Sequence, residues 1–431
     1  MSAAFPISIA AIVVLAVLGA PIGHAMIAGS ILYLFIAGQD LAIAAEQLLQ
    51  GLYGSYILLA IPLFIFAADL MNAGTLSDRL LRFCHALVGR FRGGLGHVNV
   101  VASLIFSGMS GSAIADAVGL GRIIINMMTR EGRYSAAYAG AITAASATIG
   151  PIIPPSIPMV VYAFVSDASI GYLFLGGVVP GFLMGLALAV MNAIMARRRD
   201  FPIEDAVTLS ELPGITIRAV PALLMPVILL VGIYGGVTTP TEAAALAAAY
   251  AFLVSVALYR AITARQARAS VLASARSTAA VGLLIAGALV FNYVVTIENV
   301  PAAVHRLISG LELSPAGFIL VVNVVLLVLG CLLEGTTILL VVVPVLLPSA
   351  WALGIDPVHF GVMVVVNIMI GLITPPYGLL LFVVANITKT PLTALIREIW
   401  PFILALLVAL MVIAYVPEVV LWLPRLYGYG G

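Results

Sequence analysis

The sequence predicts an all-α polytopic membrane protein built from two inverted-topology repeats. Three observations support this fold class. First, 63% of the 431 residues are hydrophobic and only 9% are charged, with apolar runs from end to end. Second, a Gly/Pro motif in the first half returns in the second half. Third, arginine is concentrated in alternate loops. Each repeat is expected to carry a re-entrant helical hairpin and a Gly/Pro-broken transmembrane helix.

The repeated motif is Gly-x-Ile-x-Pro-Pro, which begins at Gly150 and again at Gly371, 221 residues later. Proline removes a backbone donor and clashes with the preceding turn, so each Pro pair must break its helix. The freed backbone groups cannot face lipid and must line a cavity or hold a ligand. We therefore predict broken helices at 136–166 and 357–388. A matching pair of this kind indicates the binding site of a secondary transporter.

Two further stretches, 93–128 and 313–352, are too long for one span and too short for two spans with a turn. Folded at the middle, each gives limbs that enter the bilayer without crossing it, which predicts two re-entrant hairpins. Asn99 aligns with Asn323 at an offset of 224 residues. Without a gap, that register places Ser110-Gly111-Ser112 on Glu334-Gly335-Thr336 as polar, Gly-centred tips.

The remaining apolar runs complete the expected topology. Repeat one is predicted at 1–200 and repeat two at 218–431, joined by a polar linker at 201–217. The ten predicted crossings are 5–20, 25–38, 52–72, 136–166, 171–196, 218–236, 240–258, 275–298, 357–388 and 398–420.

Orientation follows from the basic residues. With the linker in the cytoplasm, 17 of the 19 basic residues lie inside, and only Arg306 and Arg425 lie outside. The first hairpin then enters from the cytoplasm and the second from the opposite face. Both chain termini are expected to be periplasmic, which makes the two repeats inverted with respect to each other.

Four runs together resemble one known family over essentially the whole chain. They are GMSGSAIADA, ASATIGPIIPPSIPMVVYAF, TPTEAAALAAAYA and LPSAWALGIDPVHFGVMVVVNIMIGLITPPYGLLLFV. They resemble the large membrane (M) subunit of tripartite ATP-independent periplasmic (TRAP) transporters, the DctM family. The resemblance implies a sodium-coupled, elevator-type importer of an organic anion, by default a C4-dicarboxylate, in the cell inner membrane. It also implies a small four-helix membrane subunit and a periplasmic solute-binding protein as partners.

The resemblance implies sodium sites where the hairpin tips meet the broken helices. Serine and threonine hydroxyls and unwound carbonyls at these places are oxygen ligands, which suit a hard cation. The candidate cation-site residues are Ser110, Gly111, Ser112, Ser146, Thr148, Gly150, Pro151, Glu334, Gly335, Thr336, Asn367, Gly371, Thr374 and Pro375. The candidate substrate contacts are Asp116, Ser156 and Asn386.

Several of these residues have a structural alternative. Serine and glycine inside membrane helices commonly serve close packing, and amides such as Asn367 and Asn386 commonly bridge helices. Asp116 could pair with Arg122 on the same limb. Glu334 is the one titratable group at the tips, and it could hold a cation or carry a proton.

Other protein classes fit less well. An intramembrane protease needs a catalytic pair at membrane depth. Asp69 with Asp116 is the only candidate pair, and neither lies in a Gly-rich catalytic signature, so we expect no enzyme activity. A channel should show a continuous polar pore rather than polar tips and breaks. Cys84 and Cys331 predict neither a disulfide framework nor a metal centre, and no organic cofactor or nucleic acid is expected. A sodium/dicarboxylate symporter of related architecture that needs no binding protein is the main alternative.

Overall fold

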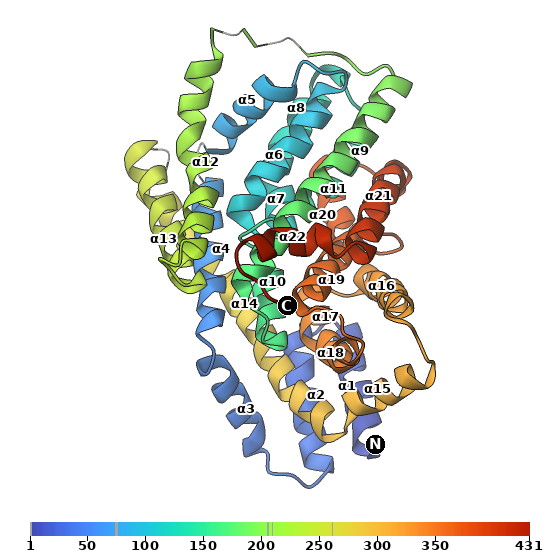
Figure 1. Ribbon diagram of the computed structural model, residues 1–431. Coiled ribbons are helices and arrows are strands. Elements are labelled where there is room, and N and C mark those ends of the chain that lie inside the picture. The colour runs from blue at the N-terminus through green and yellow to red at the C-terminus, as the bar shows by residue number, and fades with distance from the viewer. Residues whose placement is uncertain (1, 74–75, 205–206, 209, 261) are drawn as a thin grey trace.

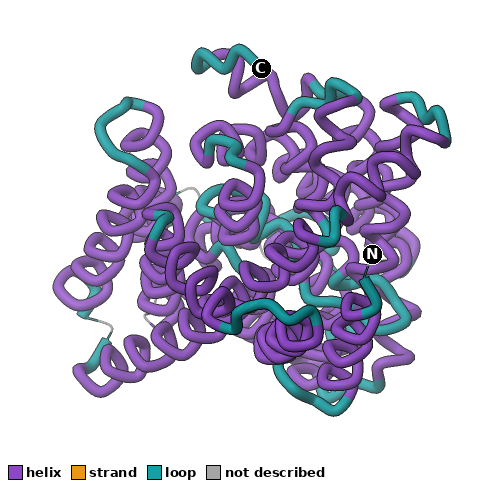
Figure 2. Tube along the Cα trace, turned by 90° about the horizontal axis from the view of Figure 1, so that it is seen from below, coloured by secondary structure: helices purple, strands orange, loops and turns teal. Residues whose placement is uncertain are grey.

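The computed structural model describes residues 2–73, 76–204, 207–208, 210–260 and 262–431. In these ranges the chain is helical, with no β-strand and one isolated bridge between Arg92 and Ile203. Figure 2 shows helices throughout, joined by short loops. The predicted all-α fold class is therefore confirmed.

The first half contains eleven α-helices within the described residues. They are α1 Ala4–Val17, α2 Ile22–Ile36, α3 Ala42–Tyr53, α4 Ala60–Ala73, α5 Leu76–Val88, α6 Gly94–Ser110, α7 Ala113–Asp116, α8 Arg122–Thr129, α9 Ala136–Ala147, α10 Ile157–Ser166 and α11 Ile170–Arg198. A π-helical turn, η2 Ala117–Gly121, joins α7 to α8, and short 3₁₀ turns η1 Tyr56–Leu59 and η3 Arg130–Gly132 precede α4 and follow α8.

The second half contains eleven more α-helices in the part of the chain that is described. They are α12 Leu212–Tyr234, α13 Pro240–Leu253, α14 Ala264–Ile297, α15 Val300–Gly310, α16 Pro315–Leu332, α17 Gly335–Val341, α18 Val343–Ala352, α19 Pro357–Gly371, α20 Leu379–Thr388, α21 Leu392–Tyr415 and α22 Glu418–Leu426. A π-helical turn, η4 Val254–Leu258, extends α13. Helix α12 starts inside the predicted linker, with a proline in its first turn, where the missing N–H costs nothing.

Six of the described helices are long and apolar enough to cross a membrane, or up to eight if two bent pairs each count as one span. The sequence predicted ten crossings. Five predicted crossings are not single long helices: α1 and α2 have only 14 and 15 residues, the 52–72 crossing passes only as part of a bent pair with α3, and both broken helices are divided into shorter pieces. Helix α16, with 18 residues, is also long and apolar enough to cross a membrane, although the sequence predicted it to be a hairpin limb.

Local capping explains where α13 begins. The Thr239 hydroxyl accepts a hydrogen bond from the Glu242 N–H, and the Glu242 carboxylate accepts one from the Thr239 N–H, which makes a capping box. The capping box therefore makes Glu242 a first-turn residue that fixes the start of α13.

The helices form two packed groups. In the first, which we call the framework helices, α1–α4, α13 and α14 pack on one another. In the second, which we call the central helices, α9, α11, α19 and α21 pack on one another. Figure 1 shows α6 and α8 at one end of the molecule, α15 at the other, and α7 and α17 between them. Both predicted hairpin tips therefore lie in the middle of the molecule, where they line one cavity.

The segment that leaves α11 folds back on the base of the first hairpin. Arg92 contacts Asp200 at 2.7 Å and Arg133 contacts Glu204 at 2.6 Å. Between these pairs the Phe201 ring lies 4.9 Å from the ring of Tyr134. At the end of α11, Arg199 pairs with Glu398 of α21 at 2.7 Å. We call residues 199–204 the return segment.

Both broken helices are interrupted at the Gly/Pro motif. The first is non-helical over 148–156 and the second over 372–378, and both Pro–Pro peptide bonds are cis. The second interruption is covered by α16, because Gly330 crosses directly over Gly371. A Cβ placed on Gly371 would lie 2.7 Å from the Gly330 Cα. Only glycine allows the two backbones to approach this closely.

We expect Gly371→Ala to destabilise the protein by about 1–3 kcal/mol, because the new methyl group meets backbone that cannot move aside. The measurement is the thermal unfolding midpoint of the purified protein in detergent. Gly282→Ala on α14 is the matched control, since nothing lies within 4 Å of its added Cβ. That variant should be neutral or slightly more stable, as alanine favours helix over glycine. Equal losses in both variants would contradict the close crossing.

Candidate substrate and cation site

A cavity of about 220 Å³ lies where the two hairpin tips meet the framework helices. The first tip and the first break contribute residues from α6, α7 and α10 and the loops beside them. The second tip, α19 and the break that follows it contribute from the other half, while α4 and α14 close the remaining side. The lining residues are Ile65, Ala68, Asp69, Ser110, Gly111, Ser112, Ala113, Ile114, Ala115, Pro151, Ile157, Pro158, Ser277, Val281, Glu334, Thr336, Met369 and Leu372.

The first tip is a turn at Gly111. Helix α6 ends at Ser110, and Gly111 has φ 61°, a left-handed conformation that favours glycine. A Cβ on Gly111 would also lie 2.5 Å from the Pro155 carbonyl oxygen, so the tip sits directly on the first break. Ser112 then caps α7, its hydroxyl accepting from the Ala115 N–H at 3.4 Å.

The second tip is built on a different cap. Helix α16 ends at Leu332, and Glu334 is the N-cap of α17. Its carboxylate accepts hydrogen bonds from the Thr337 N–H at 3.1 Å and from the Thr336 hydroxyl at 2.8 Å. Glu334 therefore has the same position in its tip as Ser112, and not as Ser110. The ungapped register predicted from the sequence is wrong by two residues here, because the turn at Gly111 is absent from the second tip.

The threonines at the two breaks have similar local bonds. The Thr148 hydroxyl donates to the Ala145 carbonyl at 2.6 Å, and the Thr374 hydroxyl donates to the Ile370 carbonyl at 2.7 Å. Each donation uses the single hydroxyl proton, so the oxygen lone pairs remain available as ligands. Both side chains are buried, Thr148 fully and Thr374 at 8% exposure. Neither lines the cavity; both lie behind it.

A buried polar network joins α6 to α9. The Asn99 amide donates to the Thr143 hydroxyl at 2.6 Å, and the Ser146 hydroxyl donates to the Asn99 carbonyl oxygen at 2.9 Å. Ser146 also accepts from the Ser103 hydroxyl at 3.0 Å. Its proton and one lone pair are therefore committed to holding the first hairpin limb against the first broken helix. Ser146 therefore serves helix packing, which is the structural alternative to a role as a cation ligand.

A corresponding network joins α16 to α19. The Asn367 amide donates to the Asn323 side-chain oxygen at 2.8 Å and to its backbone carbonyl at 2.9 Å. Asn367 therefore bridges two helices, as amides often do. Its own side-chain oxygen is buried and has no hydrogen-bond partner among the described residues, so it keeps the capacity to bind a donor or a cation.

Asp116 is 2% exposed and lies behind the first tip. Neither carboxylate oxygen has a hydrogen-bond partner among the described residues, and a Cβ on Gly150 would lie 2.2 Å from its Oδ2. Arg122 is exposed on α8 and forms no ion pair with it within the described chain. The predicted ion-pair alternative is therefore wrong, and Asp116 packs against the first break instead.

The other two candidate substrate contacts also lie away from the cavity lining. Ser156 is fully buried and caps α10, accepting from the Met159 N–H at 3.2 Å and donating to the Pro151 carbonyl. Asn386 is exposed on α20. The predicted site residues that do line the cavity are Ser110, Gly111, Ser112, Pro151, Glu334 and Thr336. Gly335 is buried at the first turn of α17, and Pro375 lies inside the second break.

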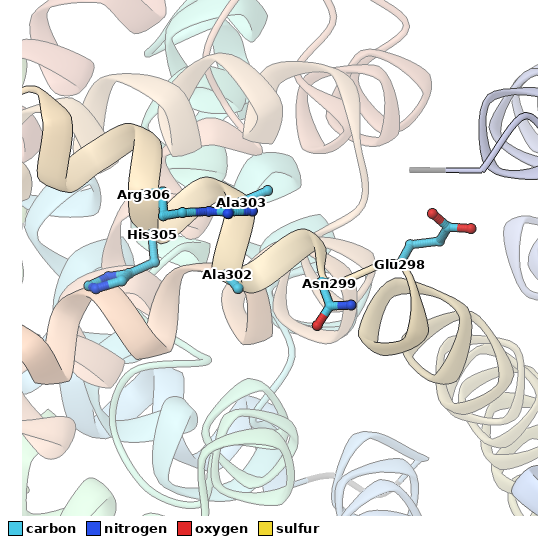
Figure 3. Close-up of a pocket in the computed structure, with 6 residues that line it drawn as sticks. All are labelled: Glu298, Asn299, Ala302, Ala303, His305 and Arg306. Atoms are coloured by element: carbon cyan, nitrogen blue, oxygen red, sulfur yellow. The ribbon is translucent and has the colours of Figure 1, made fainter.

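A larger hollow of about 570 Å³ lies at the junction of α14 and α15. Figure 3 shows that its polar side chains point apart: Glu298 points away from α15, and His305 and Arg306 do not converge on a common centre. Glu298 accepts a hydrogen bond from the Tyr33 hydroxyl at 2.7 Å, and His305 contacts Ser349 at 3.2 Å. Because a binding site needs converging polar groups, we favour the smaller cavity.

Comparison with known proteins decides the family. Residues 9–419 match the model for the tripartite ATP-independent periplasmic transporter, DctM component. The chain belongs to the DctM family. It is therefore the large membrane subunit of a TRAP transporter, as the four sequence runs predicted, and a multi-pass protein of the inner membrane.

Relatives of this DctM-family chain are named for different substrates. It is 40% identical to the sialic acid TRAP transporter large permease protein SiaM of Vibrio cholerae, over 96% of each chain. It is 43% identical to the C4-dicarboxylate large permease protein DctM of Pseudomonas aeruginosa, over 86% of this chain and 87% of that one. The 2,3-diketo-L-gulonate large permease protein YiaN of Escherichia coli is 36% identical, over 94% and 95%. These names are of permeases, in agreement with the prediction that the chain is not an enzyme.

A solved structure has a similar fold. The YdaH transporter of Alcanivorax borkumensis aligns with a TM-score of 0.63, over 87% of this chain and 88% of that one. The sequence identity is 17%, so the likeness concerns the fold alone.

The cavity also contains residues that the sequence analysis did not assign to this DctM-family site. Asp69 comes from α4, and Ser277 and Val281 come from α14. Asp69 was considered only as a protease candidate, although a carboxylate inside the apolar run 52–72 is itself a signal for function. Nothing in the sequence marks Ser277 or Val281 as a site residue, because small polar and aliphatic residues are both ordinary in a membrane helix.

Proposed function

We propose that this large permease takes up an organic anion, coupled to sodium and delivered by a periplasmic binding protein, through an elevator-type displacement. The observation that carries the proposal is the charge of the cavity. Among the described residues that line it are two carboxylates, Asp69 and Glu334, and no lysine, arginine or histidine. An anion entering such a site meets repulsion unless cations enter with it.

The oxygen atoms around the cavity support sodium as that cation. Ser110, Ser112 and Thr336 bring hydroxyls to the lining. Behind them, Thr148 and Thr374 hold free lone pairs beside unwound backbone. Hydroxyl and carbonyl oxygens, which are neutral and do not titrate, suit a hard monovalent cation. Glu334 adds negative charge at the second tip, and Asn367 adds one unpartnered oxygen.

The packing supports an elevator-type movement. The cavity lies on the boundary between two groups of helices: α4 and α14 belong to the framework helices, while both tips pack with the half-helices of the central group. A substrate bound at such a boundary changes its access when one group slides along the other.

The remaining components follow from the tripartite family. We propose a small four-helix membrane subunit and a periplasmic solute-binding protein as the two partners. C4-dicarboxylates are the first substrates to test, followed by sialic acid and 2,3-diketo-L-gulonate, for which relatives are named. All of these are organic acids, so the same requirement for an accompanying cation applies to each of them.

The test is uptake into proteoliposomes that contain the chain and its small membrane subunit. We expect an inward sodium gradient to drive uptake of the delivered anion, and we expect no uptake when the binding protein is left out. Replacing sodium by choline at equal ionic strength is the control. Full-rate uptake by this chain alone, without a binding protein, would refute the proposal and favour the binding-protein-independent symporter.

A second experiment concerns the cation ligands. Thr374→Ala and Thr336→Ala each remove one oxygen, and we expect each to raise the sodium concentration for half-maximal uptake about tenfold, which corresponds to about 1.4 kcal/mol. Ser146→Ala is the matched control, because that hydroxyl is committed to Asn99 and Ser103. It should lower stability without changing the sodium concentration required.

Glu334→Gln separates sodium from proton coupling. Under sodium coupling, uptake by this variant still follows the sodium gradient. If uptake by the wild-type protein instead follows a proton gradient, and is lost in Glu334→Gln while both threonine variants behave normally, the sodium assignment is wrong.

We further propose that both termini are periplasmic. A cysteine at position 2 or 431 should then react with a membrane-impermeant thiol reagent added to intact spheroplasts. The native Cys84 and Cys331 are buried, so they contribute little background. Protection of either terminal cysteine until the membrane is opened would show that this topology is incorrect.

A further inference from the structure

Among the described residues, Asp69 is the one carboxylate that lines the cavity from the framework helices. It lies on α4, which packs along α13 and α14, and it is partly exposed. The residues that share the cavity with it include Ser110 to Ser112 of the first tip and Glu334 and Thr336 of the second. A substrate held between the tips therefore lies against this side chain.

The charge of Asp69 is weakly compensated. One hydroxyl, that of Ser274, donates to its Oδ2 at 2.6 Å, and no ion pair of the described residues includes it. Ser274 also donates to the Ser270 carbonyl at 2.9 Å, so a single proton is shared between two acceptors. Glu334, by contrast, accepts from a backbone N–H and a hydroxyl at the start of α17. Asp69 is thus the carboxylate whose field in the cavity is least cancelled by its surroundings.

We propose that Asp69 acts as an electrostatic gate that excludes the substrate anion unless the coupling cation is already bound. This inference rests on the proposed function. A like charge across a small, partly dehydrated cavity lowers the occupancy of an anion by roughly tenfold or more. A cation bound at the tips offsets that repulsion. Asp69 is then a selectivity residue that suppresses leakage of the anion without sodium, rather than a ligand that the anion requires.

The position of the gate on α4 fits this role. A carboxylate on a hairpin tip would move together with the substrate and would therefore lie beside it in every state. A carboxylate on the framework helices stays at the boundary, and each substrate that enters the cavity there meets it. The same carboxylate on a tip would also be tied to helix capping, as Glu334 is, and its removal would disturb the site itself.

The experiment compares uptake without sodium in four proteins: the wild type, Asp69→Asn, Asp69→Glu and Ser274→Ala. Each is reconstituted with its small membrane subunit and supplied with the binding protein. Radiolabelled succinate is the first probe and sialic acid the second, with choline replacing sodium on both sides. We expect Asp69→Asn to raise sodium-free uptake at least tenfold over the wild type. Asp69→Glu keeps the charge, and Ser274→Ala removes only its hydrogen bond, so both should resemble the wild type.

Two results would overturn the inference. One is sodium-free uptake by Asp69→Asn no faster than that of the wild type. The other is loss of all uptake in Asp69→Asn, with and without sodium, while its elution volume and unfolding midpoint match those of the wild type, since Asp69 would then be a required contact. If the wild type needs no sodium, the proposed function fails separately. The sodium-free comparison of Asp69→Asn with the wild type still decides the role of Asp69.

Discussion

The backbone groups released where two apolar helices break are the constraint on which the rest of the structure depends. In a membrane interior each unpaired N–H or C=O costs several kcal/mol. Hydrogen bonds at the breaks reduce this cost: the Ser156 hydroxyl donates to the Pro151 carbonyl at the first break, and at the second the Gly378 N–H donates to the Cys331 carbonyl at 3.3 Å. The tip at Gly111 also packs closely on the Pro155 carbonyl. Each break therefore requires a tip beside it, and the space left between the two tips becomes the cavity.

The two halves meet this constraint with different chemistry. A neutral serine caps the first tip and a carboxylate caps the second, so the second half brings a charge that the first half lacks. The networks behind the tips differ in the same way: Asn99 is joined to hydroxyls, while Asn323 is joined to another amide. The two halves thus enclose one asymmetric cavity, with a serine cap at one tip and a carboxylate cap at the other.

The sequence predicted those parts of the fold that depend on local chemistry. A Pro pair that follows a glycine interrupts both helices, whereas the single Pro180 stays inside α11, and glycine marks tight turns and close crossings. The interruptions and the Gly111 tip could therefore be predicted from the sequence. The register of the second tip was wrong because an ungapped offset assumes that both tips have the same length. Asp69 was missed because only tertiary packing brings α4 to the tips. The packing role of the Ser146 hydroxyl likewise depends on its contacts with α6, which no local sequence pattern predicts.

The return segment has a mechanical consequence. Residues 199–204 connect the end of α11 to the bases of α6 and α9 through two ion pairs and the Phe201 ring, and Arg199 adds α21. Four elements are thereby cross-braced at the end farthest from the cavity. A hairpin that is held at its base in this way does not bend at its base, and it transmits force along its length as a rigid body. Load applied at this braced end therefore reaches the tip as a translation, which preserves the shape of the surface that lines the cavity.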